Sequence, residues 1–99
     1  MKKKYTVDYF IKKFSLIPHD DWCIGTYHVS ETDQCCALGH CGMNEDYTPP
    51  MAKALIGHFA NRPFSVSAVN DGEVKKFRQK TPRTRVIAAL REIKKKASK

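Results

Sequence analysis

The stretch TPRTRVIAALREIKKKA, residues 81–97, decides the fold, because it has the spacing of a long amphipathic helix. Thr81 can cap such a helix, and Pro82 can take the first helical position, where a backbone N–H is not needed. Apolar side chains then recur on one face at Val86, Leu90, Ile93 and Ala97, with Ile87 beside them. We therefore predict a helix over 82–95 whose apolar seam packs against the rest of the chain.

Two further segments have the same helical spacing. Thr6 can cap a helix over 6–17, in which the apolar residues are Val7, Phe10, Ile11 and Phe14. The pair Thr48-Pro49 opens a helix over 49–60, with an apolar stripe formed by Ala52, Leu55, Ile56 and Phe59. The sequence thus predicts three main helices.

Short strands are expected between these helices. Residues 22–29 are rich in aromatic and β-branched side chains, and the polar run 30–34 can turn the chain back, so we predict a hairpin over 22–36. Residues 37–40 have the composition of a short helical turn. The alternation of Phe64, Val66 and Ala68 predicts one more short strand.

Ninety-nine residues are the size of one domain. The predicted fold class is α+β: a single compact domain over 1–99, with about three main helices packed with a small β-hairpin or sheet. The basic ends, 1–5 and 95–99, are expected to fray. One core is expected to bury together Trp22, Leu38, Leu55, Phe59, Val86 and Leu90.

The sequence lacks an apolar run of the ~20 residues that a membrane-spanning helix needs. The start Met1-Lys2-Lys3-Lys4 resembles the charged start of a signal peptide, but Asp8, Lys12 and Lys13 interrupt the apolar run that such a peptide requires. We therefore expect a cytoplasmic protein. In that reducing compartment the four cysteines are expected to be free thiols or metal ligands and not disulfides.

The charge of the chain is +8 and is unevenly distributed. Residues 75–99 carry eleven Lys and Arg and one acid, Glu92, whereas residues 1–74 carry seven Lys and Arg and nine acids. Such asymmetry favours a polyanionic partner: nucleic acid, an acidic protein surface or an anionic membrane surface.

The basic segment supplies the candidate binding residues, which are Lys75, Lys76, Arg78, Lys80, Arg83, Arg85, Arg91 and Lys94. The part before Thr81 is expected to be a loop, and the rest to be the outer face of the last helix. Arg83 and Arg85 oppose the helix dipole, which favours their retention for a partner. We expect their replacement by Ala to weaken phosphate contacts without unfolding the domain. The alternative is that the basic residues bind no partner and are simply solvated by water.

A metal site and a thiol site are two further hypotheses. His19 and Cys23, with Cys36 and His40, could supply four ligands to a tetrahedral zinc, although the spacing is not that of a common zinc finger. Buried packing cysteines are the favoured interpretation, so no metal and no cofactor is predicted. Cys36 at a helix start could also be a nucleophile, but thiol proteases of that kind usually need a larger scaffold. Its partners would be drawn from His40, His58, Asn70 and Asp71.

Several short motifs follow one another in a definite order: Trp22-Cys23-Ile24-Gly25, Cys36-Ala37-Leu38-Gly39, Asn70-Asp71, Thr84 and the run 86–90. This order resembles a family of small bacterial and phage domains of unknown function. The chain departs from the family pattern at His40, where Ala is usual, and at Val69, where Trp is usual. The resemblance implies one compact domain, a cytoplasmic setting and an origin in a mobile element, and it implies no catalytic activity.

Three functions therefore stay open, in this order. The first is a non-enzymatic module that binds nucleic acid or a nucleoprotein through the C-terminal basic loop and helix. The second is a phage or mobile-element protein that binds and modulates a host protein through an acidic surface of that protein. The third is a Cys/His metal or thiol site.

Overall fold

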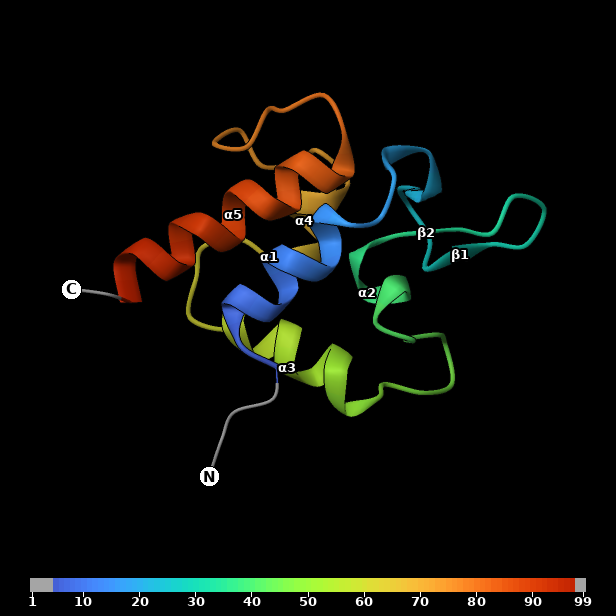
Figure 1. Cartoon of the computed structure of the whole chain (residues 1–99), viewed down its shortest axis with the longest axis horizontal. Helices are drawn as coiled ribbons and strands as arrows, with labels where there is room; N and C mark the ends of the chain where they lie inside the picture. Colours follow the sequence, from blue (N-terminus) through green and yellow to red (C-terminus); the bar gives the residue numbers. More distant parts are fainter. Residues whose placement is uncertain (1–4, 98–99) are drawn as a thin grey trace.

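The computed structural model describes residues 5–97, and side chains through Lys96. The elements in chain order are α1 (Val7–Ser15), η1 (His19–Asp21), β1 (His28–Val29), β2 (Gln34–Cys35), α2 (Ala37–His40), α3 (Pro50–Phe59), α4 (Val66–Asn70) and α5 (Pro82–Ala97) (Figure 1). Three long helices and one small antiparallel strand pair confirm the predicted α+β class. The expected fraying falls partly on 1–4 and 98–99, which lie outside the described residues, and α5 itself continues through Ala97.

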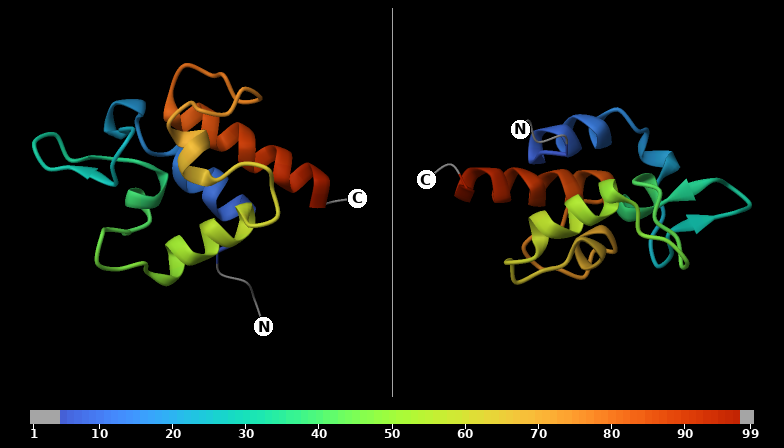
Figure 2. Two further views of the ribbon diagram at one scale, coloured as in Figure 1. Left: turned by 180° about the vertical axis from the view of Figure 1, so that it is seen from behind. Right: turned by 90° about the horizontal axis from the view of Figure 1, so that it is seen from below.

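The helix α5 lies in the middle of the fold. Figure 2 shows α1 on one side of it and α4 with the loop 71–81 on the other. The helices α1 and α5 run antiparallel, and Asp8 near the start of α1 pairs with Lys94 near the end of α5. The seam residues Val86, Leu90 and Ile93 are buried, and Trp22, Leu38, Leu55 and Phe59 share the same core, as predicted.

The predicted threonines cap two of the three long helices, whereas α3 begins after Pro49 without a side-chain cap from Thr48. The Thr6 hydroxyl accepts a hydrogen bond from the backbone N–H of Tyr9, 3.1 Å away, at the start of α1. At the start of α5, the Thr81 hydroxyl accepts from the N–H of Thr84 over 3.3 Å. Each bond satisfies a donor that the first turn would otherwise leave unpaired.

The strand predicted over 64–68 is wrong, because this segment begins the helix α4. The Ser65 hydroxyl accepts from the N–H of Ala68 over 3.1 Å and so caps the helix. Val66 and Val69, three residues apart, are both buried, which is helical spacing. Phe64 lies outside the helix and packs edge-on against Phe77, at 5.0 Å between ring centroids. The apparent alternation of three apolar residues was therefore a helix start preceded by a loop residue.

The predicted hairpin is present but much shorter than 22–36. Only two residues on each side pair, His28 with Cys35 and Val29 with Gln34. Residues 22–27 are not a strand: Gly25 has a φ of +79°, which reverses the extended backbone. Trp22 and its neighbour Cys23 are both buried, which an alternating strand does not allow.

The side chain of Asn70 joins three of the sequence motifs at one buried point. Its Oδ1 accepts from the N–H of Ala37 over 3.0 Å, and its Nδ2 donates to the carbonyl of Cys23 over 2.9 Å. The neighbouring Asp71 accepts from the N–H of Gly25 over 3.1 Å. Asn70 is 1% exposed. The motifs are thus parts of one internal hydrogen-bond junction that ties the hairpin region to α4.

Candidate nucleic-acid interface

The predicted basic residues fall into an exposed group and an internal one. Lys75, Lys76, Arg78 and Lys80 are exposed on the loop 71–81, and Arg91 and Lys94 are exposed on α5. Phe77 is 4% exposed and anchors the loop to the core, so it is a core residue and not a base-stacking one. The loop is therefore held against the body of the protein with its cations outward.

Arg85 does not belong to the exposed group, which corrects the sequence-based set. It is 8% exposed, and its guanidinium donates to three backbone carbonyls: Val69 over 3.2 Å, Asn70 over 2.7 Å and Gln79 over 2.9 Å. These bonds fasten α5 to the end of α4 and to the loop 71–81. These three bonds contradict the expectation that Arg85 can be removed without destabilising the fold.

Arg83 has an intermediate position. It is half-buried, and its Nη1 donates to the carbonyl of Ile17 over 3.1 Å, which joins the start of α5 to the segment after α1. Within the described residues no other hydrogen bond of its guanidinium occurs. Arg83 therefore retains donors for a partner while its position is fixed.

Some of the exposed cations are neutralised within the protein. Glu92 pairs with Lys76 and, at 3.8 Å, with Lys96, and the hydrogen bond from Lys76 lowers the pKa of Glu92. Lys94 pairs with Asp8 over 2.6 Å. Among the described residues, the exposed cations without an acidic partner within 4.0 Å include Lys75, Arg78, Lys80, Arg91 and Lys95.

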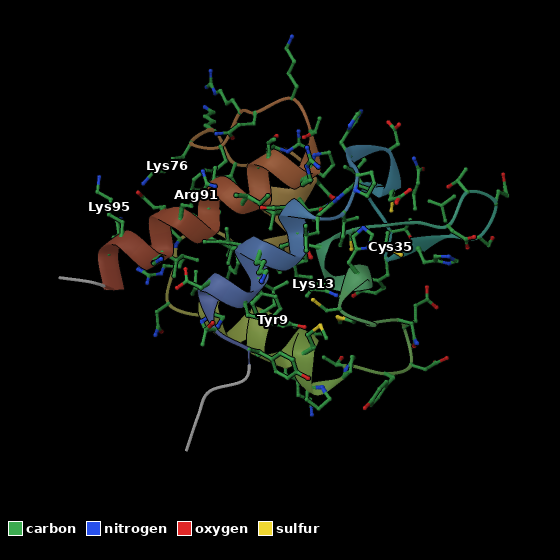
Figure 3. The ribbon with its side chains drawn as sticks, viewed as in Figure 1. Tyr9, Lys13, Cys35, Lys76, Arg91 and Lys95 are labelled. Carbon is green, nitrogen blue, oxygen red and sulfur yellow. The ribbon has the colours of Figure 1, made fainter. Side chains whose placement is uncertain are left out.

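Basic side chains of the loop 71–81 and of α5 lie together on one side of that helix. In Figure 3, Arg91 and Lys95 lie on the same side of α5 as Lys76 of the loop, whereas Lys13 lies on α1. Arg91 and Lys95 are four residues apart, so they share one face of the helix. The loop and this helix face together form the surface that we call the basic face, made of Lys75, Arg78, Lys80, Arg91 and Lys95.

A shallow hollow of about 360 Å³ adjoins the basic face. It lies between the end of α1, the loop 71–81 and the first half of α5, and its lining includes both Arg83 and Arg91. Sequence reasoning had no signal for it, because Ser15 and Gln79 reach it only through the packing of α1 and the loop against α5. Its lining contains no acidic side chain.

The charge of the rest of the chain is more sharply divided than the sequence reasoning recognised. Residues 14–52 contain six of the ten acids and no Lys or Arg. These acids are all exposed, on η1, on the hairpin turn and on the connection before α3, at the end of the molecule opposite the C-terminal end of α5 (Figure 1). We call them the acidic lobe; they are Asp20, Asp21, Glu31, Asp33, Glu45 and Asp46. A window count of charge along the chain would have found this lobe.

The four candidate zinc ligands do not converge. His19 is exposed in η1 and lies 2.9 Å from Asp20, whereas His40 packs its ring on Trp22, with centroids 4.8 Å apart. Among the residues that the structure describes, no group of three or more His, Cys, Asp or Glu side chains is arranged to hold a metal ion. The zinc hypothesis therefore has no geometric support in this part of the chain.

The thiol hypothesis is disfavoured by the surroundings of the cysteines, all four of which are free thiols. Cys36 is buried, as predicted, and its sulfur caps the short helix α2 by accepting from the N–H of Gly39 over 3.5 Å. Burial nevertheless raises the pKa of Cys36, and burial raises the pKa of Cys41 to about 12. His58 is one of the suggested bases, but its Nε2 is hydrogen-bonded to the backbone carbonyl of Tyr5 over 2.9 Å. A nucleophilic cysteine needs the opposite shift in pKa.

Comparisons with protein-family models, with curated proteins and with solved structures find no match for this chain. None of the described helices is long and apolar enough to cross a lipid bilayer. The surface of the protein is therefore the basis for its proposed function.

Proposed function

We propose that this protein is a non-enzymatic module that binds nucleic acid through its basic face, chiefly by contacts with backbone phosphates. The observation that carries the proposal is the basic face itself: five exposed cations, on a loop anchored by Phe77 and on one side of α5, that have no acidic side chain within 4.0 Å among the described residues. Cations that only make a protein soluble do not need to lie on the same side of it, and they do not need a loop that is anchored to the core.

The separation of charge supports the same proposal. The basic face attracts a polyanion, whereas the acidic lobe, which lies opposite the C-terminal end of α5, repels it, so this end of α5 and the loop 71–81 would meet an approaching duplex first. Phosphate contacts of this kind position a protein without reading sequence. We therefore expect binding with little sequence preference.

Binding isotherms at several salt concentrations, with duplex DNA and duplex RNA, test the proposal. Each phosphate contact on DNA contributes a slope of about −0.9 to the plot of log affinity against log salt, so four to six contacts lose on the order of a hundredfold or more between ~50 and ~200 mM salt. Lys80→Gln should shallow the slope by about 1. The matched control is Lys53→Gln, which removes one exposed cation from α3, away from the basic face. Absence of binding at low salt would overturn the proposal.

A protein partner is the second candidate, and one observation favours it. A hollow of about 600 Å³ has a mostly apolar lining that includes Ile56, Phe59 and Phe64, with Arg62 as its charged member. Ile56 is 39% exposed. A host protein bound by a phage or mobile-element product would bury such a surface. Ile56→Asp should then abolish that complex and leave nucleic-acid binding unchanged, because Ile56 lies outside the basic face.

A further inference from the structure

The hollow beside the basic face is bounded at both ends by arginine. Arg83 and Arg91 are eight residues apart on α5, which places their Cα atoms about 12 Å apart along the helix axis. The helix surface between them is formed by Thr84, Ile87 and Ala88. Two arginine side chains can reach across this interval from opposite ends, because the intervening residues include small ones.

The donors that face a ligand in the hollow are the arginines and not the hydroxyl groups. The Ser15 hydroxyl donates to the carbonyl of Ile11 over 2.6 Å, and the Thr84 hydroxyl donates to the carbonyl of Thr81 over 3.0 Å. Gln79 can add its side-chain amide at the edge formed by the loop. A ligand in the hollow would therefore accept hydrogen bonds mainly from guanidinium groups, which favours a ligand with negative charge.

The rim of the hollow is held in place by the interior of the protein. Arg83 is fixed by the carbonyl of Ile17. The backbone of Gln79 is fixed by the hydrogen bond that its carbonyl accepts from the buried Arg85, over 2.9 Å. A hollow with fixed walls loses less conformational entropy when it takes a ligand than a set of free surface lysines does.

We infer that this hollow is a seat for one phosphate group of the nucleic-acid backbone, held between the guanidinium groups of Arg83 and Arg91. The inference rests on the proposed function and makes it more specific: one phosphodiester is bound by paired arginines, and the lysines of the basic face contact its neighbours. Planar guanidinium groups bind phosphate oxygens in pairs, which a lysine ammonium cannot reproduce.

Three variants separate the seat from a general cationic surface. Arg91→Lys keeps the charge but removes the paired hydrogen bonds, and it should weaken binding to duplex DNA about tenfold. Ala88→Leu fills the hollow without changing the charge, and it should weaken binding similarly. The matched control is Lys95→Gln, one turn beyond the hollow, which should weaken binding about threefold and shallow the salt slope by about 1. If wild-type protein binds DNA but Arg91→Lys and Ala88→Leu bind as well as wild type, the seat is refuted and the proposed function stands.

Titration with inorganic phosphate gives a readout that does not need nucleic acid. In nuclear magnetic resonance spectra, saturable shifts should occur at the side-chain N–H signals of Arg83 and Arg91 and should be absent in Ala88→Leu, with equal ionic strength of sodium chloride as the reference. If wild type shows these shifts but binds neither DNA nor RNA, the hollow does bind an anion. Its assignment to a nucleic-acid backbone is then overturned. Equal binding to vesicles of anionic lipid would also overturn that assignment. Absence of saturable shifts would refute the seat.

Discussion

The guanidinium of Arg85 donates a 2.7 Å hydrogen bond to the backbone carbonyl of Asn70, whose own side chain joins Cys23 to Ala37. These two buried residues link α5, α4 and the hairpin region in one continuous network. We expect Arg85→Ala to lower the free energy of unfolding by about 2–4 kcal/mol, because three backbone carbonyls lose a charged donor.

Chemical denaturation of Arg85→Ala and of Arg91→Ala measures this difference. Arg91 is exposed, so its removal should change the stability by no more than about 0.5 kcal/mol. Arg85→Ala should also weaken nucleic-acid binding indirectly, by freeing the loop 71–81. Equal stability of the two variants would show that the buried network does not hold the fold together.

The contrast between Arg85 and Arg91 also shows how far the sequence could predict the interface. Both are arginines in one helix with a basic composition, and the sequence places Arg85 next to the seam at Val86 without revealing that a guanidinium can be satisfied there. The three carbonyls that accept from Arg85 come from α4 and the loop 71–81, which pack against this part of α5 only in the folded protein. Long-range hydrogen bonds of this kind have no periodic signature along the chain.

The fold was more predictable where local signals agreed. The helices α1, α3 and α5 each have a capping or proline signal and an apolar stripe of helical period, and all three lie close to their predicted ranges. The segment 64–68 failed because three alternating apolar residues fit a strand as well as the start of a helix. The hairpin was overextended because Gly25 interrupts a run whose composition otherwise suits a strand.

Two glycines allow an opposite pair of predictions. A Cβ at Gly39 would overlap the carbonyl oxygen of Tyr27, which is backbone and cannot move freely, so Gly39→Ala should destabilise the protein by about 2 kcal/mol or more. At Gly57, inside α3, a Cβ would meet no atom within 4 Å, so Gly57→Ala should stabilise it by about 0.5–1 kcal/mol. Thermal unfolding of both variants provides the measurement, and a shift of the same sign in both would contradict this account.

The pH dependence of stability should include a contribution from His40. Burial lowers the pKa of His40, so between pH 6.5 and its folded-state pKa the unfolded chain binds a proton that the folded protein does not. The stability contributed is fully present above about pH 6.5 and is lost as the pH falls through that value. Wild type should therefore lose more stability than His40→Gln between pH 7.5 and 5.5, as measured by urea denaturation. An identical loss in the two proteins would show that His40 titrates normally.

The cysteines should be slow to react with thiol reagents in the folded protein. A pKa of about 12 for Cys41, against an ordinary value of 9.0, reduces its thiolate fraction about a thousandfold at pH 8. Cys35 is the most exposed of the four and should be labelled first. Timed alkylation with mass spectrometry measures the order, and Cys35→Ser should remove the early product. Labelling of Cys36 before Cys35 would revive the nucleophile hypothesis.

The acidic lobe should reduce nucleic-acid affinity from a distance. Glu31 and Asp46 are exposed and lie outside the basic face, so they affect a bound duplex only through the field of their charges. The Debye length is about 30 Å at 0.01 M salt and about 8 Å at 0.15 M, which is short beside the 43 Å long axis of the protein. The variant Glu31→Gln with Asp46→Asn should therefore bind DNA more tightly than wild type at 0.01 M salt, about twofold or more, and equally at 0.15 M. Tighter binding that persisted at 0.15 M would mean that the acidic lobe contacts the duplex directly, and weaker binding at either concentration would mean that the lobe takes part in recognition.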